Sequence, residues 1–530
     1  MPQKAGAVRR FNTRGPCVPE LHYMVDTTDR IDTIVRDYIE PGEYFTINRP
    51  RQYGKTTTLE AIRRALADAD LIVEVSFESL GAVLDSEERF IPEFCRLVAE
   101  PLAASPALLG DGVLQDLTAP FDGAPTFTEL GRRITRLCSV VPGRIVVLID
   151  EVDRATDYAV FAGFLGLLRY KYIKRATAAA STFHSVILAG VHDVKNLKKR
   201  IRPDSEHAYN PPWNIAVPFT VELAFSPGDI VTMLREFEAD HRTGMDLAEV
   251  AEALHDFTSG YPVLVSRLCE MVHGAGLAWT RPGVESAVSA LLCEQNTLFD
   301  DLIKNLERHP DLRDLVGRIV LRGDRVPFNR AVPVIDLGAR YGISTETGNG
   351  VGIGNRIFET YLTEYLVARE ATTPSAERFL SDEPQFGRDG RLDMALLVTR
   401  FAAFMREEYR DEDGSFIERH ARLLFLAFLR PIVNGKGFYF IEPETRGARR
   451  MDIVVVYGGE EHVVELKVWH GQRREDNAVR QLVGYLAARG RDRGYLVSFT
   501  DQAHRPRQDA TFEVDGRTVT EVVVAYRDKE

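Results

Sequence analysis

Residues 44–66 read YFTINRPRQYGKTTTLEAIRRAL, and this segment is the strongest indication of the fold of the N-terminal part of the chain. Apolar and β-branched residues at 44–48 predict a short strand, and apolar residues return at helical spacing after residue 55. Between the two, Gly54-Lys55-Thr56 matches the end of the G-x-x-x-x-G-K-[ST] phosphate loop, although Arg49 stands where that motif has its first glycine. The order of strand, loop and helix predicts an α/β nucleotide-binding domain.

The residue types of this phosphate loop suit triphosphate chemistry. Backbone N–H groups of a tight loop and of a helix N-terminus bind phosphates, and Gly54 lacks the Cβ that would block their approach. Lys55 supplies positive charge to the β- and γ-phosphates, while the Thr56 hydroxyl ligates Mg²⁺. We therefore expect ATP and Mg²⁺ as cofactors. The expected nucleotide-binding residues of the loop are Arg51, Gln52, Tyr53, Gly54, Lys55, Thr56 and Thr57.

An acidic pair follows a second apolar run. Residues 145–149 are all apolar and end in Asp150-Glu151. Such a strand would place Asp150 beside the magnesium ion and Glu151 where it can polarise an attacking water. The alternative is an acidic turn after a core strand. Further strands at 71–77 and 184–191 alternate with helical stretches, which predicts a mostly parallel sheet covered by helices.

The sequence pattern of the remaining chain changes twice. After Ser226 the pattern is helical, and residues 371–393 combine Pro, Ser, Gly and charge as a linker does. The expected domains are an ATPase core at 1–225, a helical lid at 226–306, a winged-helix-like module at 307–370, that linker, and a small α/β domain at 394–530. In the last domain we expect helices at 394–409, 416–430 and 475–489, strands at 437–442 and 495–499, and a hairpin at 451–469.

The hairpin sequence MDIVVVYGGEEHVVELKVW (451–469) carries a second set of chemical groups. Glu465 and Lys467 are two apart on a strand, so they point to one face while Leu466 faces the core. The hairpin can bring Asp452 alongside them. Two carboxylates bind Mg²⁺, with Mn²⁺ as a substitute, and the ion activates water for attack on a phosphodiester. Lys467 would orient the nucleophile or neutralise developing charge.

Two helices flank this hairpin. Glu418 begins the upstream helix and offers a third carboxylate. Gln481 and Tyr485 lie four apart on the downstream helix and share one face.

The N-terminal motifs resemble those of the STAND-related AAA-like ATPases, whose RPR(x)(F/Y)GK(S/T) loop also lacks the first glycine. Similar segments are 22–26, 188–198, 259–268 and 355–362. The resemblance implies ATP binding with slow or regulated hydrolysis that drives domain movement. It also offers His192, Asp193 and Arg267 as sensors of the γ-phosphate, and a structural role explains each of these three equally well. It offers Arg200 or Arg202 as a trans-acting finger, although nothing in the spacing singles out either residue.

Residues 410–500 resemble the RecB-like branch of the PD-(D/E)XK nuclease superfamily, and more closely the nuclease domain appended to those ATPases. The resemblance implies that Glu418, Asp452 and Glu465 ligate metal, that Lys467 is catalytic, and that Gln481 and Tyr485 support them. A degenerate domain retained for binding is the alternative. The full set of expected catalytic residues is Glu151, Glu418, Asp452, Glu465, Lys467, Gln481 and Tyr485. The expected metal ligands are Thr56, Asp150, Glu418, Asp452 and Glu465.

Composition limits the function classes. The formal net charge is −12, yet residues 416–530 carry 19 Lys and Arg against 17 Asp and Glu, so the acidic excess lies upstream. No apolar run approaches the roughly 20 residues of a membrane span, and the five cysteines form no CxxC pair. The charge asymmetry fits a C-terminal domain that meets phosphates, and an ordinary neutral domain explains it equally well. We expect a cytoplasmic protein whose partner is nucleic acid, DNA in the first instance, and a homo-oligomer is compatible with the sequence.

Three functions fit these observations. The leading hypothesis is an ATP-regulated nuclease in antiphage defence or mobile-element control. The second is a nucleotide-switched signalling or binding protein with an inactive nuclease-like domain. The third is a transcription-linked ATPase whose winged-helix-like region contacts DNA.

Overall fold

A computed structural model describes most of the chain. The described residues are 9–103, 112–175, 177, 181–191, 213–322, 324–348, 350–371, 386–388, 391–408, 418–433, 437–440, 453–468, 472–488, 490–501 and 509–527. They form two compact units, one of Met1–Arg242 with Gly260–Arg267 and one of Thr243–Ser259 with Leu268–Glu530. The finer division into lid, module and linker stays a prediction, and most of the expected linker lies outside the described residues.

A parallel sheet forms the centre of the first unit. Its strands are β1 (Tyr44–Asn48), β2 (Leu71–Ser76), β3 (Ile145–Asp150) and β4 (Ser185–Gly190), in the order β1-β4-β3-β2. Every pairing is parallel. An isolated parallel bridge joins Phe45 to Val217 on the free side of β1. The four strands expected from the sequence are therefore confirmed, and β4 separates the strand of the phosphate loop from the strand that ends in Asp150.

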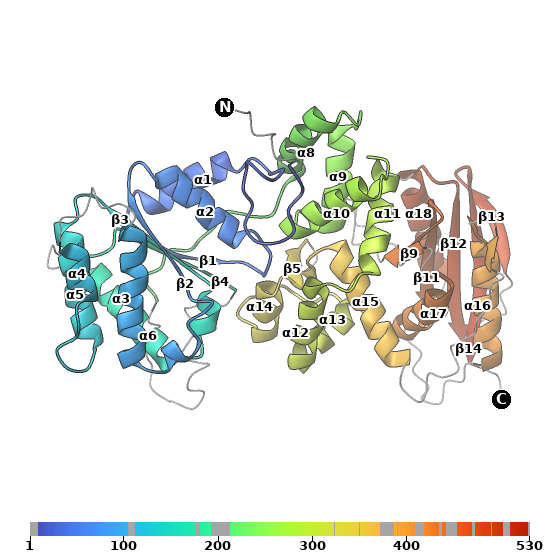
Figure 1. Cartoon of the computed structure of the whole chain (residues 1–530). Helices are drawn as coiled ribbons and strands as arrows, with labels where there is room; N and C mark the ends of the chain where they lie inside the picture. The colour runs from blue at the N-terminus through green and yellow to red at the C-terminus, as the bar shows by residue number, and fades with distance from the viewer. Residues whose placement is uncertain are drawn as a thin grey trace. The chain divides into compact units, whose positions relative to one another are not determined.

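Helices cover both faces of this sheet (Figure 1). Apolar residues of α1 (Thr28–Ile34) and α2 (Lys55–Leu66) pack on one face with Val146 and Leu148. Residues of α3 (Glu87–Ala103), α5 (Phe127–Val140) and α6 (Ala159–Arg175) pack on the other face with Val147 and Ile149. This alternation along one strand follows from the two-residue period of a strand and explains why β3 is apolar throughout. Further helices among the described residues of the unit include α4 (Val113–Thr118) and α8 (Pro227–His241).

The second unit begins with helices, as the sequence predicts downstream of residue 226. These are α9 (Leu247–Thr258), α10 (Pro262–Gly274), whose first residues belong to the first unit, α11 (Arg281–Leu292), α12 (Thr297–Arg308), α13 (Pro310–Arg322), α14 (Pro333–Arg340) and α15 (Arg356–Ala371). Strands β5 (Ser344–Thr347) and β6 (Gly350–Ile353) form an antiparallel pair between α14 and α15. This pair lies within residues 307–370, where the winged-helix-like module is expected.

A six-stranded sheet forms the C-terminal part of the second unit, in the order β13-β14-β12-β11-β10-β9. The strands are β9 (Gly437–Phe440), β10 (Ile453–Tyr457), β11 (Glu460–Val468), β12 (Arg493–Asp501), β13 (Ala510–Val514) and β14 (Arg517–Arg527). Strands β9, β10 and β11 are antiparallel neighbours. Helix α18 (Gln472–Ala488) then leads from β11 to the parallel β12, which also pairs in parallel with β14.

The two faces of this sheet differ in character. Apolar residues of α16 (Met394–Glu408) and α17 (Glu418–Val433) pack on one face with Leu466 and Val497. Helix α18 covers the other face, where a Cβ added at Gly494 would lie 2.9 Å from the side chains of Leu482 and Leu486. The expected helices, hairpin and two strands of this region are confirmed, with ends that differ by a few residues. Strands β13 and β14, and the short pair β7 (Gly387–Arg388) and β8 (Arg391–Leu392), were not expected.

Candidate functional site

The phosphate loop joins β1 to α2 and has two residues in the left-handed region. Gly54, at the N-cap of α2, has φ 80° and ψ 13°, and Gln52 has φ 55°. A Cβ at Gly54 would meet no atom within 4 Å. The backbone conformation, rather than crowding within the protein, therefore requires glycine at this position.

Lys55 lies inside the loop rather than in solvent. Its side chain is buried, and its Nζ donates to the carbonyl oxygens of Arg49 at 3.1 Å and Pro50 at 2.8 Å. Burial lowers the pKa of Lys55, and the nearby carboxylates of Asp153 and Glu151 oppose that shift. The loop is thus closed around the ammonium group by its own backbone.

The loop and the end of β3 meet in one hydrogen bond. Thr56 Oγ1 donates to Asp150 Oδ2 at 2.7 Å, although β4 separates the two strands that carry these residues. Glu151 follows with φ 56°, and its backbone N–H donates to Asp150 Oδ1 at 2.8 Å. Burial and the neighbouring Asp150 raise the pKa of Glu151. The structure therefore brings together Lys55, Thr56, Asp150 and Glu151, as the sequence predicted.

Arg49 explains how the loop forms without its first glycine. Its Nη2 donates to the carbonyl oxygen of Val221 at 2.7 Å, and its Nη1 donates to that of Asn48 at 3.0 Å. The guanidinium also lies 5.5 Å from the centre of the Phe219 ring. The side chain leaves the loop and joins it to residues 219–221. Sequence reasoning treated Arg49 only as a departure from the motif and missed this role.

Three other expected loop residues, Arg51, Tyr53 and Thr57, contact protein groups. Thr57 Oγ1 accepts a hydrogen bond of 3.2 Å from the backbone N–H of Cys17, which belongs to the segment before α1. Tyr53 lies edge-on to Tyr261, with ring centroids 4.8 Å apart. The Tyr261 hydroxyl donates to the carbonyl oxygen of Arg51 at 2.5 Å.

A second polar site lies on β11 in the C-terminal sheet. Glu465 is fully buried, and Lys467 Nζ lies 3.2 Å from Glu465 Oε1. Leu466 faces the apolar core on the opposite side, as predicted. Gln481 and Tyr485 lie on α18, the helix that covers the face carrying Glu465, and Tyr485 is buried.

Two of the predicted metal ligands of this site have side chains outside the described residues. Asp452 lies outside the described residues, and so does the side chain of Glu418, whose backbone begins α17. Within the described part of the chain, no group of three or more His, Cys, Asp or Glu side chains is arranged to bind a metal ion.

Sequence reasoning missed an acidic residue on the same face as Glu465. Glu465 pairs with Leu496 on β12, and Leu496 pairs on its other side with Glu521 on β14, so both carboxylates lie in one row across the sheet. Ser498 Oγ donates to Glu521 Oε1 at 2.5 Å, and both side chains are buried. The available signal was an acidic residue inside the otherwise β-branched run of 519–524.

The family of the chain follows from its N-terminal two thirds. A family model described as AAA-like domain matches residues 21–364. The chain belongs to this AAA-like family. The match includes the phosphate loop, β3 and the helices up to α15, so the first unit of the AAA-like protein contains its P-loop ATPase core. The six-stranded sheet lies beyond the matched residues, and no curated protein matches the chain.

Solved structures similar to this AAA-like protein are distant in sequence. The Walker-type ATPase of Pyrococcus abyssi is 16% identical, with 66% of this chain and 99% of that chain covered and a TM-score of 0.47. The ORC2 protein of Aeropyrum pernix, in ADPNP–ADP complexes, is 12% identical over 65% of this chain and 95% of that chain, with a TM-score of 0.37. Likenesses this weak assign neither a ligand nor an activity to the chain.

A hydrogen bond that the sequence did not predict holds the end of β4 in the AAA-like domain. Asp153 Oδ2 accepts a 2.7 Å hydrogen bond from the backbone N–H of Val191. A Cβ at Gly190 would lie 2.8 Å from Val152. The suggested sensors His192 and Asp193 and the suggested fingers Arg200 and Arg202 lie outside the described residues, whereas Arg267 lies on α10.

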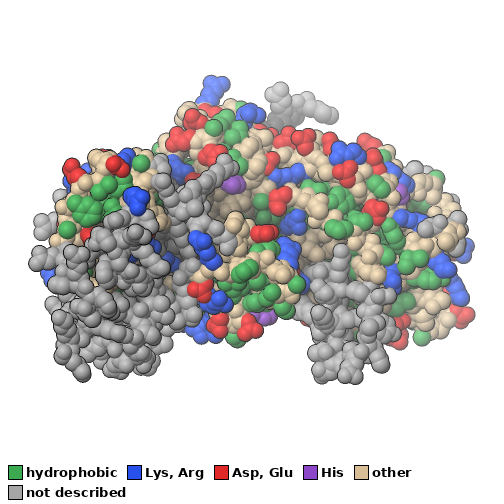
Figure 2. Space-filling model, turned by 180° about the vertical axis from the view of Figure 1, so that it is seen from behind, with side chains coloured by type: hydrophobic (Ala, Val, Ile, Leu, Met, Phe, Trp, Pro, Cys, Tyr) green, Lys and Arg blue, Asp and Glu red, His purple; other side chains and the backbone are tan. Residues whose placement is uncertain are grey.

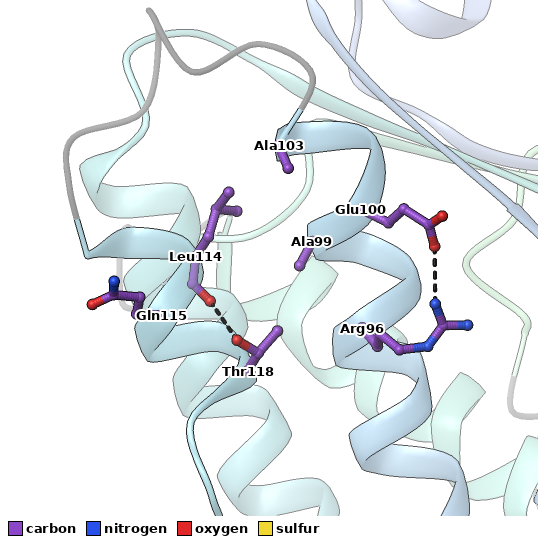
Figure 3. Close-up of a pocket in the computed structure, with 7 residues that line it drawn as sticks. All are labelled: Arg96, Ala99, Glu100, Ala103, Leu114, Gln115 and Thr118. Carbon is purple, nitrogen blue, oxygen red and sulfur yellow. Dashed lines mark hydrogen bonds and ion pairs between the residues drawn. The ribbon is translucent and has the colours of Figure 1, made fainter.

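The AAA-like domain also has a shallow hollow of about 370 Å³ (Figure 3). It is lined by Arg96, Ala99, Glu100, Ala103, Leu114, Gln115 and Thr118 of α3 and α4. None of these residues belongs to the phosphate loop or to the end of β3, so the hollow is separate from the candidate nucleotide site. A search of the described residues finds no helix that is both long and apolar enough to cross a membrane.

Proposed function

We propose that this AAA-like protein is an ATP-regulated, metal-dependent nuclease that acts on nucleic acid, with DNA as the expected substrate. The observation that carries the nucleotide half is the 2.7 Å hydrogen bond between Thr56 and Asp150 beside the buried Lys55. The observation that carries the nuclease half is the Glu465–Lys467 pair on a buried strand.

In the proposed ATPase site, Lys55 neutralises the β- and γ-phosphates of ATP. The Thr56 hydroxyl and the Asp150 carboxylate are hard oxygen donors that already lie side by side, so they suit Mg²⁺. Bound there, the ion supplies charge stabilisation to the phosphates. Glu151 accepts the proton of the attacking water and must be ionised to do so.

In the proposed nuclease site, Glu465, Asp452 and Glu418 are the metal ligands. Asp452 precedes Ile453 in the sequence, and Ile453 pairs with Val464, the residue before Glu465, which favours a shared site. The strand order around β11 has antiparallel β9 and β10 on one side and the parallel β12, reached through α18, on the other, and it supports the proposal of a PD-(D/E)XK domain. Magnesium or manganese would activate water there, and Lys467 stabilises charge on the phosphate.

The winged-helix-like module is a weaker candidate for contacting DNA. Arg340 forms an ion pair with Asp336 on α14, and Arg318 forms one of 2.8 Å with Asp324. Arginines paired in this way offer less charge to phosphates than unpaired ones. Figure 2 likewise shows acidic and basic side chains mixed on the face that it displays. The two ion pairs disfavour the module as the place where the nucleic acid binds.

The runner-up proposal keeps the nucleotide switch and makes the C-terminal domain an inactive binding module for signalling. Both versions of the proposal are compatible with homo-oligomerisation and with a role in antiphage defence or mobile-element control. The two versions differ in one measurable property, which is whether phosphodiester bonds are broken.

A cleavage assay separates them. Wild type, Lys55→Ala, Glu465→Gln and Asp452→Ala are incubated with plasmid and with single-stranded DNA and RNA, in Mg²⁺ or Mn²⁺, with and without ATP. We expect cleavage by wild type that Glu465→Gln and Asp452→Ala abolish and that Lys55→Ala uncouples from ATP. Nucleic acid binding by wild type without cleavage in any of these conditions would favour the inactive module.

A further inference from the structure

Three consecutive carbonyl groups of the phosphate loop accept hydrogen bonds from side chains. Those of Arg49 and Pro50 accept from Lys55 Nζ, inside the loop. That of Arg51 accepts from the hydroxyl of Tyr261, which is 210 residues away in sequence. Two side chains therefore orient the backbone carbonyl groups of residues 49–51. Lys55 donates from inside the loop, and Tyr261 is the second donor.

Tyr261 itself has little freedom to move. Its carbonyl oxygen accepts from the backbone N–H of Val265 at 3.0 Å, so the residue begins the first turn of α10. The preceding Gly260 has φ 72°, and a Cβ there would lie 2.0 Å from the carbonyl oxygen of Phe225. The Phe225 N–H donates to the Gly260 carbonyl oxygen at 2.8 Å. This close backbone contact fixes the position from which Tyr261 reaches the loop.

The aromatic rings of Tyr53 and Tyr261 form a second contact next to this hydrogen bond. Tyr53 and Tyr261 are perpendicular at 84°, an arrangement in which aromatic rings attract each other. The Tyr261 side chain is buried. Gln52, with its positive φ, lies between the bonded Arg51 carbonyl and the Tyr53 ring, so both of its neighbours are restrained.

We propose that Tyr261 is a positioning residue of the nucleotide site, which orients the N–H groups of residues 52–54 for the phosphates without touching the nucleotide. The proposal rests on nucleotide binding at this loop. A loop that is ordered before binding loses less conformational entropy when the ligand arrives, so the hydroxyl strengthens binding. One neutral hydrogen bond corresponds to a change in affinity of roughly 3- to 10-fold.

The test removes only the hydroxyl. Tyr261→Phe is compared with Tyr44→Phe, a matched control in the same unit, because the buried Tyr44 hydroxyl also donates to a backbone carbonyl, that of Phe183 at 3.0 Å. The affinity of the full chain for ATPγS and ADP is measured by titration calorimetry. We expect Tyr261→Phe to weaken both by roughly 3- to 10-fold and to raise KM for ATP, with kcat at saturation within about twofold.

Amide hydrogen exchange provides a readout that needs no nucleotide. Faster exchange at residues 52–54 is expected in Tyr261→Phe and not in Tyr44→Phe. Equal affinities in wild type and Tyr261→Phe, or equal effects of the two substitutions on affinity and on exchange, would overturn the proposal. If wild type binds no nucleotide, the proposed function fails, and the exchange measurement still decides whether Tyr261 orders the loop.

Discussion

Thr56 Oγ1 donates a 2.7 Å hydrogen bond to Asp150 Oδ2, and this bond joins two segments that are 94 residues apart. It places a hydroxyl and a carboxylate oxygen within reach of one cation at the carboxyl ends of β1 and β3. Ligands bind at this edge of a parallel sheet because the loops there converge and expose backbone donors.

Thr56→Ala is expected to weaken ATP binding in Mg²⁺ and to leave binding in EDTA nearly unchanged. The reason is that the hydroxyl contributes to the cation rather than to the phosphates directly. Titration with ATPγS measures its affinity with and without Mg²⁺. We expect Mg²⁺ to raise this affinity about tenfold in wild type and to leave it nearly unchanged in the variant. Thr33→Ala on α1, where Oγ1 bonds only the helix backbone at Asp29, is the control. A magnesium dependence retained in Thr56→Ala contradicts the assignment.

Arg49→Gly restores the glycine of the common motif, yet we expect it to lower stability and nucleotide affinity. The substitution removes the hydrogen bonds to Val221 and Asn48 and the contact with Phe219. Charged hydrogen bonds of this kind contribute about 1.5–3 kcal/mol each. Thermal denaturation of Arg49→Gly and Arg49→Ala is compared with that of Arg36→Ala, whose exposed ion pair with Asp37 contributes little. Equal melting temperatures for all three variants would argue against this role.

The rate of ATP hydrolysis is expected to fall on the acid side of its pH profile at a pH above the ordinary pKa of glutamate. Desolvation and then Asp150 favour the neutral form of Glu151, so its pKa lies above 4.5. A general base must be ionised, and kcat therefore falls as pH decreases through that raised pKa. The dependence of kcat on pH locates this fall. Glu151→Gln should bind ATP and hydrolyse it at least about 100-fold more slowly, and a variant that keeps the wild-type rate removes Glu151 from the mechanism.

Ser498→Ala is expected to destabilise the C-terminal part of the second unit by about 1–3 kcal/mol, because it removes a donor to the buried Glu521 carboxylate. Urea denaturation measures the change. Glu513→Gln on the exposed part of β13 is the control and should change stability by less than about 0.5 kcal/mol. If Ser498→Ala is as stable as the control, the hydrogen bond has no net effect on folding.

Local patterns were sufficient for several parts of this molecule. The periods of apolar residues predicted β1 to β4 and the helices after Ser226, because a buried face imposes its spacing on the residues that form it. The motifs predicted which loop would carry Lys55 and Thr56, and which strand would end in Asp150. Glu465 and Lys467 on one face of β11 followed from the two-residue period of a strand.

Tertiary structure alone decided the contacts between distant segments. Nothing in the local sequence pairs Arg49 with Val221, Tyr261 with Arg51, or Ser498 with Glu521. The position of β4 between β1 and β3, and of β14 between β12 and β13, is likewise a property of chain topology. Periodicity records only which face of an element is buried, whereas the identity of its neighbour depends on packing across the whole unit. The sequence by itself therefore determined the chemical groups of the nucleotide site, and the folded structure determined the side chains that orient them.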